Sequence, residues 1–203
     1  MQAFLVSAGV VALAEMGDKT QILSLILAAR YRKPVPVILG VLTATIASHA
    51  LAGGVGTWLA SVLDPALLNW SIVASFVLMA GWILLPYKSG EGEVSLPKRP
   101  LGIFATTVLA FFLAEMGDKT QVVTVALAAR FHDFIGVVSG TTCGMMLANI
   151  PVIYLGHRFA DRIPARAVHV LAALVFVVLS GLALKNALAG ATPGAQAWLL
   201  PAA

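Results

Sequence analysis

Long apolar segments constrain this chain more than any other feature of its sequence. Of its 203 residues, 60% are hydrophobic and only 11% are charged, and the mean hydropathy is +0.94. Ordinary globular domains carry about 25% charged residues, so this composition cannot build a water-exposed surface. Because one membrane-spanning helix needs about 20 predominantly apolar residues, the chain is predicted to lie almost entirely within a lipid bilayer.

Six apolar segments are long enough to cross the bilayer as helices, and turn-forming or charged residues separate them. They are predicted over residues 2–29, 35–62, 66–86, 101–129, 134–157 and 167–188. The longest connection, residues 87–100, contains Gly, Pro and charges of both signs, which is typical of a solvated linker. Residues 189–203 are too few to span and are expected to form a tail at the interface. The predicted fold class is an all-α polytopic membrane protein with six transmembrane helices.

A duplicated string divides the chain into two halves, residues 1–86 and 101–188. LAEMGDKTQ occupies residues 13–21 and recurs without a change at residues 113–121. Further residues keep the same offset of 100: Gly40, Gly56, Phe76 and Gly81 recur as Gly140, Gly156, Phe176 and Gly181. Each half holds three predicted spans, and three is odd, so the second half enters the membrane from the opposite face. The prediction is two inverted three-helix repeats, an architecture typical of transporters.

Basic residues outside the predicted spans gather on one side of the membrane. Nine lie on that side (Arg30, Arg32, Lys33, Lys88, Lys98, Arg99, Arg158, Arg162 and Arg166) and two on the other (Arg130 and Lys185). Cytoplasmic loops carry the excess of Lys and Arg, so the linker is predicted to be cytoplasmic and both termini to face outward. The same placement explains the net charge of +4 without a nucleic-acid partner.

Six charged residues lie where charge is costly, inside the first and fourth spans. They are Glu15, Asp18 and Lys19, and their repeats Glu115, Asp118 and Lys119. Each Asp or Lys at a helix centre costs about 2.5 to 3.5 kcal/mol on insertion scales, so a functional role is the default hypothesis. The alternative is a structural ion-pair network, because Glu15 and Lys19 are four residues apart. Pairing both lysines nevertheless leaves two carboxylates over.

The four carboxylates are expected to converge on one site. Within each motif the two acids are three residues apart and share a helix face, and the inverted symmetry brings the two faces together near the midplane. Further oxygen ligands are available from Thr20, Gln21, Thr120 and Gln121. Such ligands suit Mg²⁺, Ca²⁺ or Mn²⁺. Four acids and two lysines leave a charge of minus two, which one divalent cation or two protons would neutralise, so exchange of metal for protons is the hypothesis.

Glycines within the motifs raise the question of whether these helices are continuous. The first span would be roughly 42 Å long against a hydrocarbon core of about 30 Å, so it must tilt or break. A break at Gly17 and Gly117 would free backbone carbonyls for an ion; close helix packing is the equal alternative. Small residues follow helical spacing in the second and fifth spans and predict packing seams for the motif helices: Pro36, Gly40, Ala44 and Ser48, and Gly136, Gly140, Gly144 and Ala148.

His49 and its repeat counterpart Asn149 lie deep in the second and fifth spans. Such residues are often only hydrogen bonders between helices, and an accessory role in handling protons or ions is the alternative. The single cysteine, Cys143, excludes an intrachain disulfide and a cysteine-based metal centre. No prosthetic group is expected, and the sequence leaves homo-oligomer formation open.

The doubled E-x-G-D-K-T motif resembles the E-x-G-D-[KR]-[TS] family of small cation transporters. This family includes the Golgi manganese and calcium transporters of eukaryotes, a chloroplast branch and bacterial manganese exporters. The resemblance implies secondary active transport, and not catalysis: Mn²⁺ or Ca²⁺ would leave the cytosol in exchange for protons. It further implies that Glu15, Asp18, Glu115 and Asp118 bind the ion, with Lys19, Thr20, Lys119 and Thr120 completing the motifs. The short linker and the lack of a preceding segment resemble bacterial members, which favours a plasma membrane.

Other classes of function fit the sequence less well. Intramembrane aspartyl proteases carry G-x-G-D, whereas Glu15 stands two residues before Gly17. Export of an organic cation or amino acid is disfavoured, because no aromatic residue next to the acids could cage an organic group. A passive cation channel is the third alternative, against which the predicted inverted repeat argues.

Overall fold

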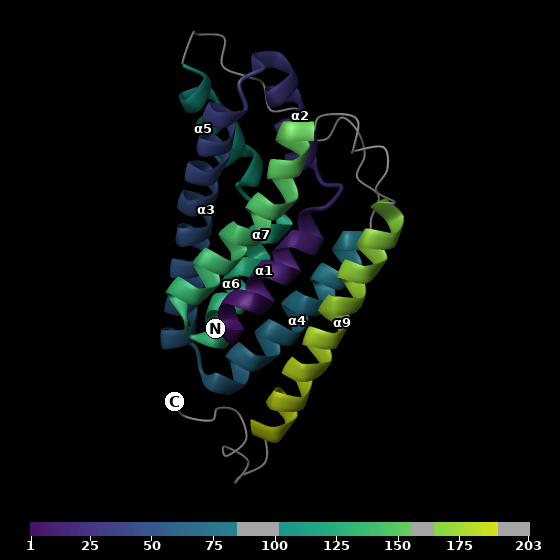
Figure 1. Ribbon diagram of the computed structural model, residues 1–203. Helices are drawn as coiled ribbons and strands as arrows, with labels where there is room; N and C mark the ends of the chain where they lie inside the picture. Colours follow the sequence, from purple (N-terminus) through teal and green to yellow (C-terminus); the bar gives the residue numbers. More distant parts are fainter. Residues whose placement is uncertain (85–101, 156–164, 191–203) are drawn as a thin grey trace.

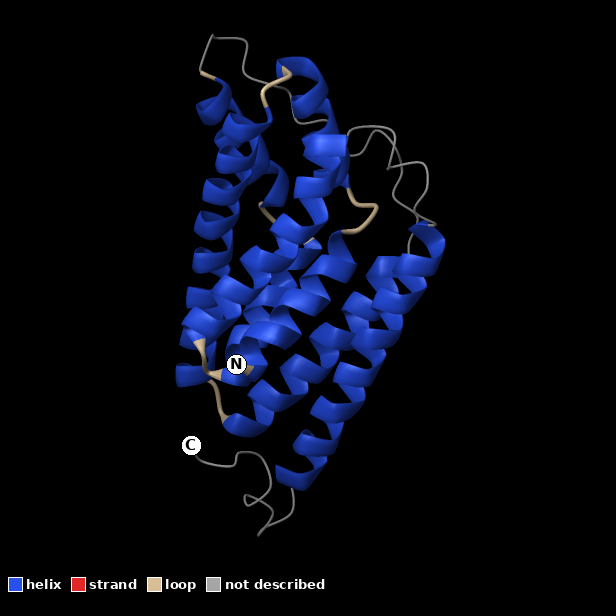
Figure 2. Ribbon diagram, viewed as in Figure 1, coloured by secondary structure: helices blue, strands red, loops and turns tan. Residues whose placement is uncertain are grey.

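The computed structural model describes residues 1–84, 102–155 and 165–190 (Figure 1), and every regular element in these ranges is a helix (Figure 2). The predicted linker, most of the predicted tail, and Arg158 and Arg162 lie outside the described residues. The helices of the first half are α1 (Gln2–Glu15), α2 (Lys19–Tyr31), α3 (Pro34–Val62) and α4 (Pro65–Leu84). Those of the second half are α5 (Ile103–Glu115), α6 (Lys119–Phe131), α7 (Phe134–Leu155) and α9 (Ala165–Gly190).

Four helices are long and apolar enough to cross a membrane, namely Pro34–Val62, Pro65–Leu84, Phe134–Tyr154 and Val170–Leu188. They match the second, third, fifth and sixth predicted spans to within a few residues. Large side chains on their outer faces are exposed, for example Leu78, Ile135 and Val178. A chain with several such helices is an integral membrane protein, and exposed apolar side chains of this kind are suited to contact with lipid.

The first and fourth predicted spans are broken helices. Each consists of two short helices, α1 and α2 or α5 and α6, of 13 or 14 residues, about 20 Å each at 1.5 Å per residue. The tan interruptions in Figure 2 include these breaks. Gly17 and Gly117 lie in them with φ angles of +84° and +74°, a left-handed conformation that glycine adopts without steric cost. Of the two alternatives from the sequence, the break is therefore the one present.

The two halves interlock around α3 and α7. Helix α1 of the first half packs on α7 of the second, and its counterpart α5 packs on α3. The predicted seams lie at these contacts: a Cβ atom added at Gly40 would stand 2.6 Å from Thr107 Cβ on α5, and one at Gly140 would meet the Phe4 carbonyl on α1. The long helices α4 and α9 lie side by side at one edge (Figure 1), with the rings of Phe76 and Phe176 6.1 Å apart. The arrangement buries the four acids at the two breaks, Glu15, Asp18, Glu115 and Asp118, whereas Gly17 and Gly117 are exposed.

Candidate functional site

Each motif forms a short loop between two half-helices. Helix α1 ends at Glu15, and α2 begins directly after Asp18, whose N–H donates to the Glu15 carbonyl at 3.1 Å. The Gln21 side chain closes the loop, since its Oε1 accepts from the Gly17 N–H at 2.8 Å. The second motif repeats this bond from the Gly117 N–H to Gln121 Oε1 at 3.0 Å. Both glutamines were predicted as possible accessory ion residues, and in the structure their Oε1 atoms accept these backbone bonds.

The two aspartates sit at helix N-termini without capping them. An aspartate at this position usually accepts from its own helix backbone, but neither side chain makes such a bond. Instead, Asp18 Oδ1 lies 2.9 Å from Lys119 Nζ, and Asp118 Oδ1 lies 3.1 Å from Lys19 Nζ. The lysines therefore pair across the two motifs. The i,i+4 spacing of Glu15 and Lys19 had suggested pairing within one helix instead.

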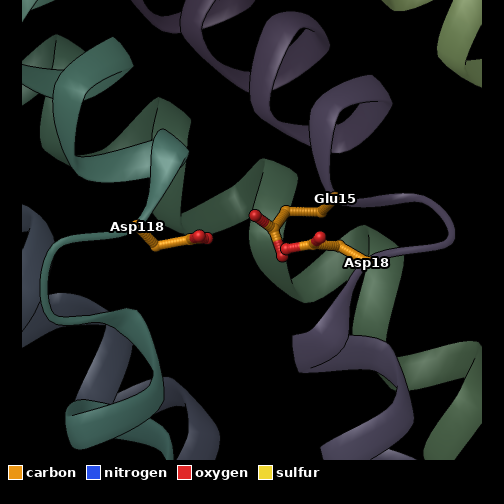
Figure 3. A group of neighbouring side chains, drawn as sticks. All are labelled: Glu15, Asp18 and Asp118. Carbon is orange, nitrogen blue, oxygen red and sulfur yellow. The ribbon is translucent and has the colours of Figure 1, made fainter. Parts of the chain in front are cut away.

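Three carboxylates from the two motifs come together (Figure 3). One oxygen each from Glu15, Asp18 and Asp118 lies within 4.8 Å of the others, and all three residues are buried. The Thr20 hydroxyl donates to Glu15 Oε2, and Thr120 donates to Asp118 Oδ2 at 3.5 Å. Glu15 Oε1 and Asp18 Oδ2 have no hydrogen-bond partner. Unpaired buried acceptors are costly, so this cluster is suited to a cation.

The fourth predicted acid, Glu115, lies apart from this cluster. It is fully buried, accepts a hydrogen bond from the Ser48 hydroxyl of α3, and has its Oε1 3.5 Å from His49 Nε2. The helical spacing of small residues predicted Ser48 only as part of a packing seam. A signal was available, because the repeat places Ala148 opposite Ser48 and Asn149 opposite His49. Helix α7 therefore offers Glu15 neither the hydroxyl nor the imidazole that α3 offers Glu115.

Asn149 serves packing in the structure. Its Oδ1 accepts from the Ser24 hydroxyl at 2.6 Å, and its Nδ2 donates to the Met145 carbonyl at 3.0 Å. The bond from Ser24 joins α2 to α7, and the bond to Met145 stays within α7. Asn149 thus takes part in a hydrogen bond between helices, and the accessory role of His49 and Asn149 in handling protons or ions stays a prediction.

The charges and dipoles of the site favour a hard divalent cation. Four buried acids face two lysines, which leaves minus two when His49 is neutral. The N-termini of α2 and α6 lend partial positive charge to the aspartates, while the C-termini of α1 and α5 point carbonyl oxygens toward the breaks. Among the described residues, the three clustered carboxylates are the set positioned to hold one metal ion. Carboxylate and carbonyl oxygens suit Mg²⁺, Ca²⁺ and Mn²⁺.

The fold and site together define a helical membrane protein of two related halves, each with motif carboxylates at a helix break. Comparison with known protein families identifies the family to which the chain belongs. The sequence matches the family described as "Divalent cation/proton antiporter GDT1" twice, over residues 3–91 and 103–191, and the chain belongs to this family.

Relatives come from bacteria and plants. A Vibrio cholerae protein named "Putative manganese exporter" is 47% identical over 181 residues, which cover 89% of each chain. A GDT1-like protein of Synechocystis is 28% identical over 202 residues, covering 89% of this chain and 95% of its own. "GDT1-like protein 3" of Arabidopsis thaliana is 26% identical and is covered over 67% of its length. No solved structure matches the chain.

Proposed function

We propose that this chain is a secondary active transporter that exports Mn²⁺ from the cytosol in exchange for protons. The observation that carries the proposal is the buried cluster of Glu15, Asp18 and Asp118, in which two oxygens lack any partner. The description of the family as a divalent cation/proton antiporter supports the reaction, and the name of the Vibrio cholerae relative supports the metal. Ca²⁺ has the same ligand chemistry and is the second substrate to test.

The proposed membrane architecture has six spans, four continuous and two broken. The pairs α1–α2 and α5–α6 each cross the bilayer as one interrupted span, so residues 1–86 and 101–188 form two inverted repeats. The reciprocal packing of α1 on α7 and of α5 on α3 supports this symmetry. By the positive-inside rule, the linker 87–100 is cytoplasmic, both termini face outward, and the membrane is the bacterial plasma membrane.

Charge balance supplies the proposed coupling. The empty site carries minus two, so it accepts either one divalent cation or two protons, and both loaded forms are neutral inside the low-dielectric membrane. Charge left uncompensated there is strongly disfavoured. The protein with an empty site therefore changes slowly between the conformation open to one side of the membrane and the conformation open to the other. Only the metal-loaded and the doubly protonated sites are neutral enough to change sides. Metal therefore moves in one direction across the membrane and protons move in the other. In this scheme Glu15, Asp18 and Asp118 hold the metal, and Glu115 is the fourth acid that contributes to the balance.

The test is Mn²⁺ uptake into proteoliposomes containing the pure protein. Glu15→Gln and Asp118→Asn each keep the side-chain shape and remove one charge, so the site loses a ligand and its neutral loaded form. We expect both variants to lose uptake while eluting as folded protein. Asp64→Asn is the matched control, because Asp64 is exposed and accepts from the Ala66 N–H at the start of α4, a role that Asn fills equally well. Uptake at the wild-type rate in Asp118→Asn would contradict the proposed site.

A further inference from the structure

A second group of buried polar atoms lies between α3 and the end of α5. His49 is fully buried, and neither of its ring nitrogens has a hydrogen-bond partner. Its Nε2 is 3.5 Å from Glu115 Oε1, which also has no hydrogen-bond partner. The Ser48 hydroxyl holds the other carboxylate oxygen, Oε2, and so aims Oε1 at the imidazole. A nitrogen and an oxygen, both buried and both unsatisfied, thus face each other at a distance beyond an ordinary hydrogen bond.

This separation matches two ligands of one first-row metal ion. Ligand atoms that each lie about 2.1 Å from a metal are about 3 to 3.5 Å apart when the angle between them is 90 to 110°. The other half of the molecule has no such pair: the Asn149 amide is bonded to Ser24 and Met145. The sequence already contains this asymmetry, because the repeat counterparts of Ser48 and His49 are Ala148 and Asn149.

We propose that Glu115, His49 and Ser48 form a second cation station whose imidazole selects Mn²⁺ over Ca²⁺. This inference rests on the proposed function and adds its substrate selectivity. Ca²⁺ takes oxygen ligands only, whereas transition metals also gain from imidazole nitrogen. The three-carboxylate cluster binds either ion, whereas the imidazole of His49 strengthens the binding of the transition metal only. Glu115 and Asp118 flank the same helix break, so the proposed station lies next to the three-carboxylate cluster.

The first experiment detects the nitrogen directly and needs no transport. Mn²⁺ bound to the full-length protein in detergent is examined by pulsed electron paramagnetic resonance, which reports ¹⁴N coupled to the metal. We expect a ¹⁴N signal in wild type that changes to ¹⁵N when histidine is isotopically labelled. His49→Asn, which copies the repeat counterpart, removes the signal. Bound Mn²⁺ without any nitrogen coupling in wild type would overturn the proposal and leave His49 and Glu115 as an ion pair.

The second experiment measures selectivity by competition of Ca²⁺ against Mn²⁺ uptake in proteoliposomes. Loss of even an outer partner of a metal ligand lowers affinity about 10- to 100-fold, so His49→Asn is expected to lower the Mn²⁺ to Ca²⁺ preference at least about tenfold. Asn149→Ala, at the matched position, keeps the wild-type ratio even where packing lowers the rate. An unchanged ratio in His49→Asn would overturn the selectivity. Absence of all metal uptake in wild type would instead reject the proposed function, and the nitrogen signal would still decide the station.

Discussion

At the scale of single residues, Lys19 and Lys119 act as tethered counter-ions. Each ammonium group occupies the position beside an aspartate of the other motif that a metal ion would compete for. Lys119 is buried, whereas the Lys19 side chain is 26% exposed. Under the proposed function, a cation that displaced a lysine would lose part of its binding energy in breaking this ion pair, and its release would become easier.

Replacement of Lys119 should therefore tighten metal binding and slow transport. Lys119→Gln removes the charge 2.9 Å from Asp18 Oδ1 and leaves the empty site one unit more negative. Opposite charges this close interact by several kcal/mol at an effective dielectric constant of about 20. Because a tenfold change in affinity corresponds to about 1.4 kcal/mol, we expect Mn²⁺ to bind at least about tenfold more tightly. Calorimetry measures the affinity of each variant for Mn²⁺. The control is Lys185→Gln, because Lys185 is an exposed lysine on α9. Weaker binding in Lys119→Gln would show that the lysine supports the site rather than competing with its cargo.

The arrangement of side chains shows where the sequence stops being sufficient. Apolar periodicity and the duplicated string predicted the long helices, and burial of the acids followed from their place in the first and fourth spans. The separation of Glu115 from the other three acids did not follow, because Glu115 accepts a hydrogen bond from Ser48 of α3, which the spacing within the motif does not encode. The crossed lysine pairs were hidden for the same reason, since a continuous helix would have favoured pairing within each motif.

At the scale of elements, the helix breaks depend on the left-handed glycines. A Cβ atom added at Gly117 would meet no heavy atom within 4 Å, so only its φ of +74° opposes a side chain there. A left-handed conformation costs a non-glycine residue roughly 1 to 2 kcal/mol. Because Glu115 and Asp118 flank this turn, strain in it shifts both carboxylates.

Gly117→Ala is therefore expected to lower both the stability of the protein and its affinity for Mn²⁺. The control is Gly181→Ala in α9, where the added Cβ also meets nothing within 4 Å and the backbone is helical. That substitution should be neutral or stabilising by up to about 1 kcal/mol, because alanine favours a helix interior. Thermal unfolding in detergent and Mn²⁺ binding measure the two effects. Equal behaviour of the two variants would show that the turn does not depend on glycine.

At the scale of the whole molecule, the two halves share a sequence pattern but not their packing. Helix α6 packs closely on α3 and also contacts α4. Ala128 and Ala129 on α6 are buried, whereas the counterparts on α2, Ala28 and Ala29, are half-buried and exposed. The end of α6 is thus more deeply packed than the end of α2, and under the proposed function we expect transport to exchange these two packings.

Cysteine labelling can test this difference between the halves. In a Cys143→Ala background, with a membrane-impermeant maleimide supplied on both sides of the bilayer, Ala29→Cys should react, because Ala29 is exposed beside basic residues at the end of α2. Ala129→Cys should be protected by its burial against neighbouring helices. Saturating Mn²⁺ together with a pH gradient, which drives turnover, should raise the labelling of Ala129→Cys. Equal labelling of both cysteines before any metal is added would contradict the asymmetric packing.

The exchange of one divalent cation for two protons is the central claim, and one flux measurement tests it most directly. Proteoliposomes with an acidic lumen, clamped at zero membrane potential, receive external Mn²⁺ at a concentration equal to that inside. We expect Mn²⁺ to accumulate against its gradient while an internal dye reports alkalinisation, with two protons leaving for each Mn²⁺ that enters. Because that exchange moves no net charge, an imposed potential should leave the rate unchanged. Accumulation that fails to respond to the pH gradient, or uptake without proton movement, would contradict the account.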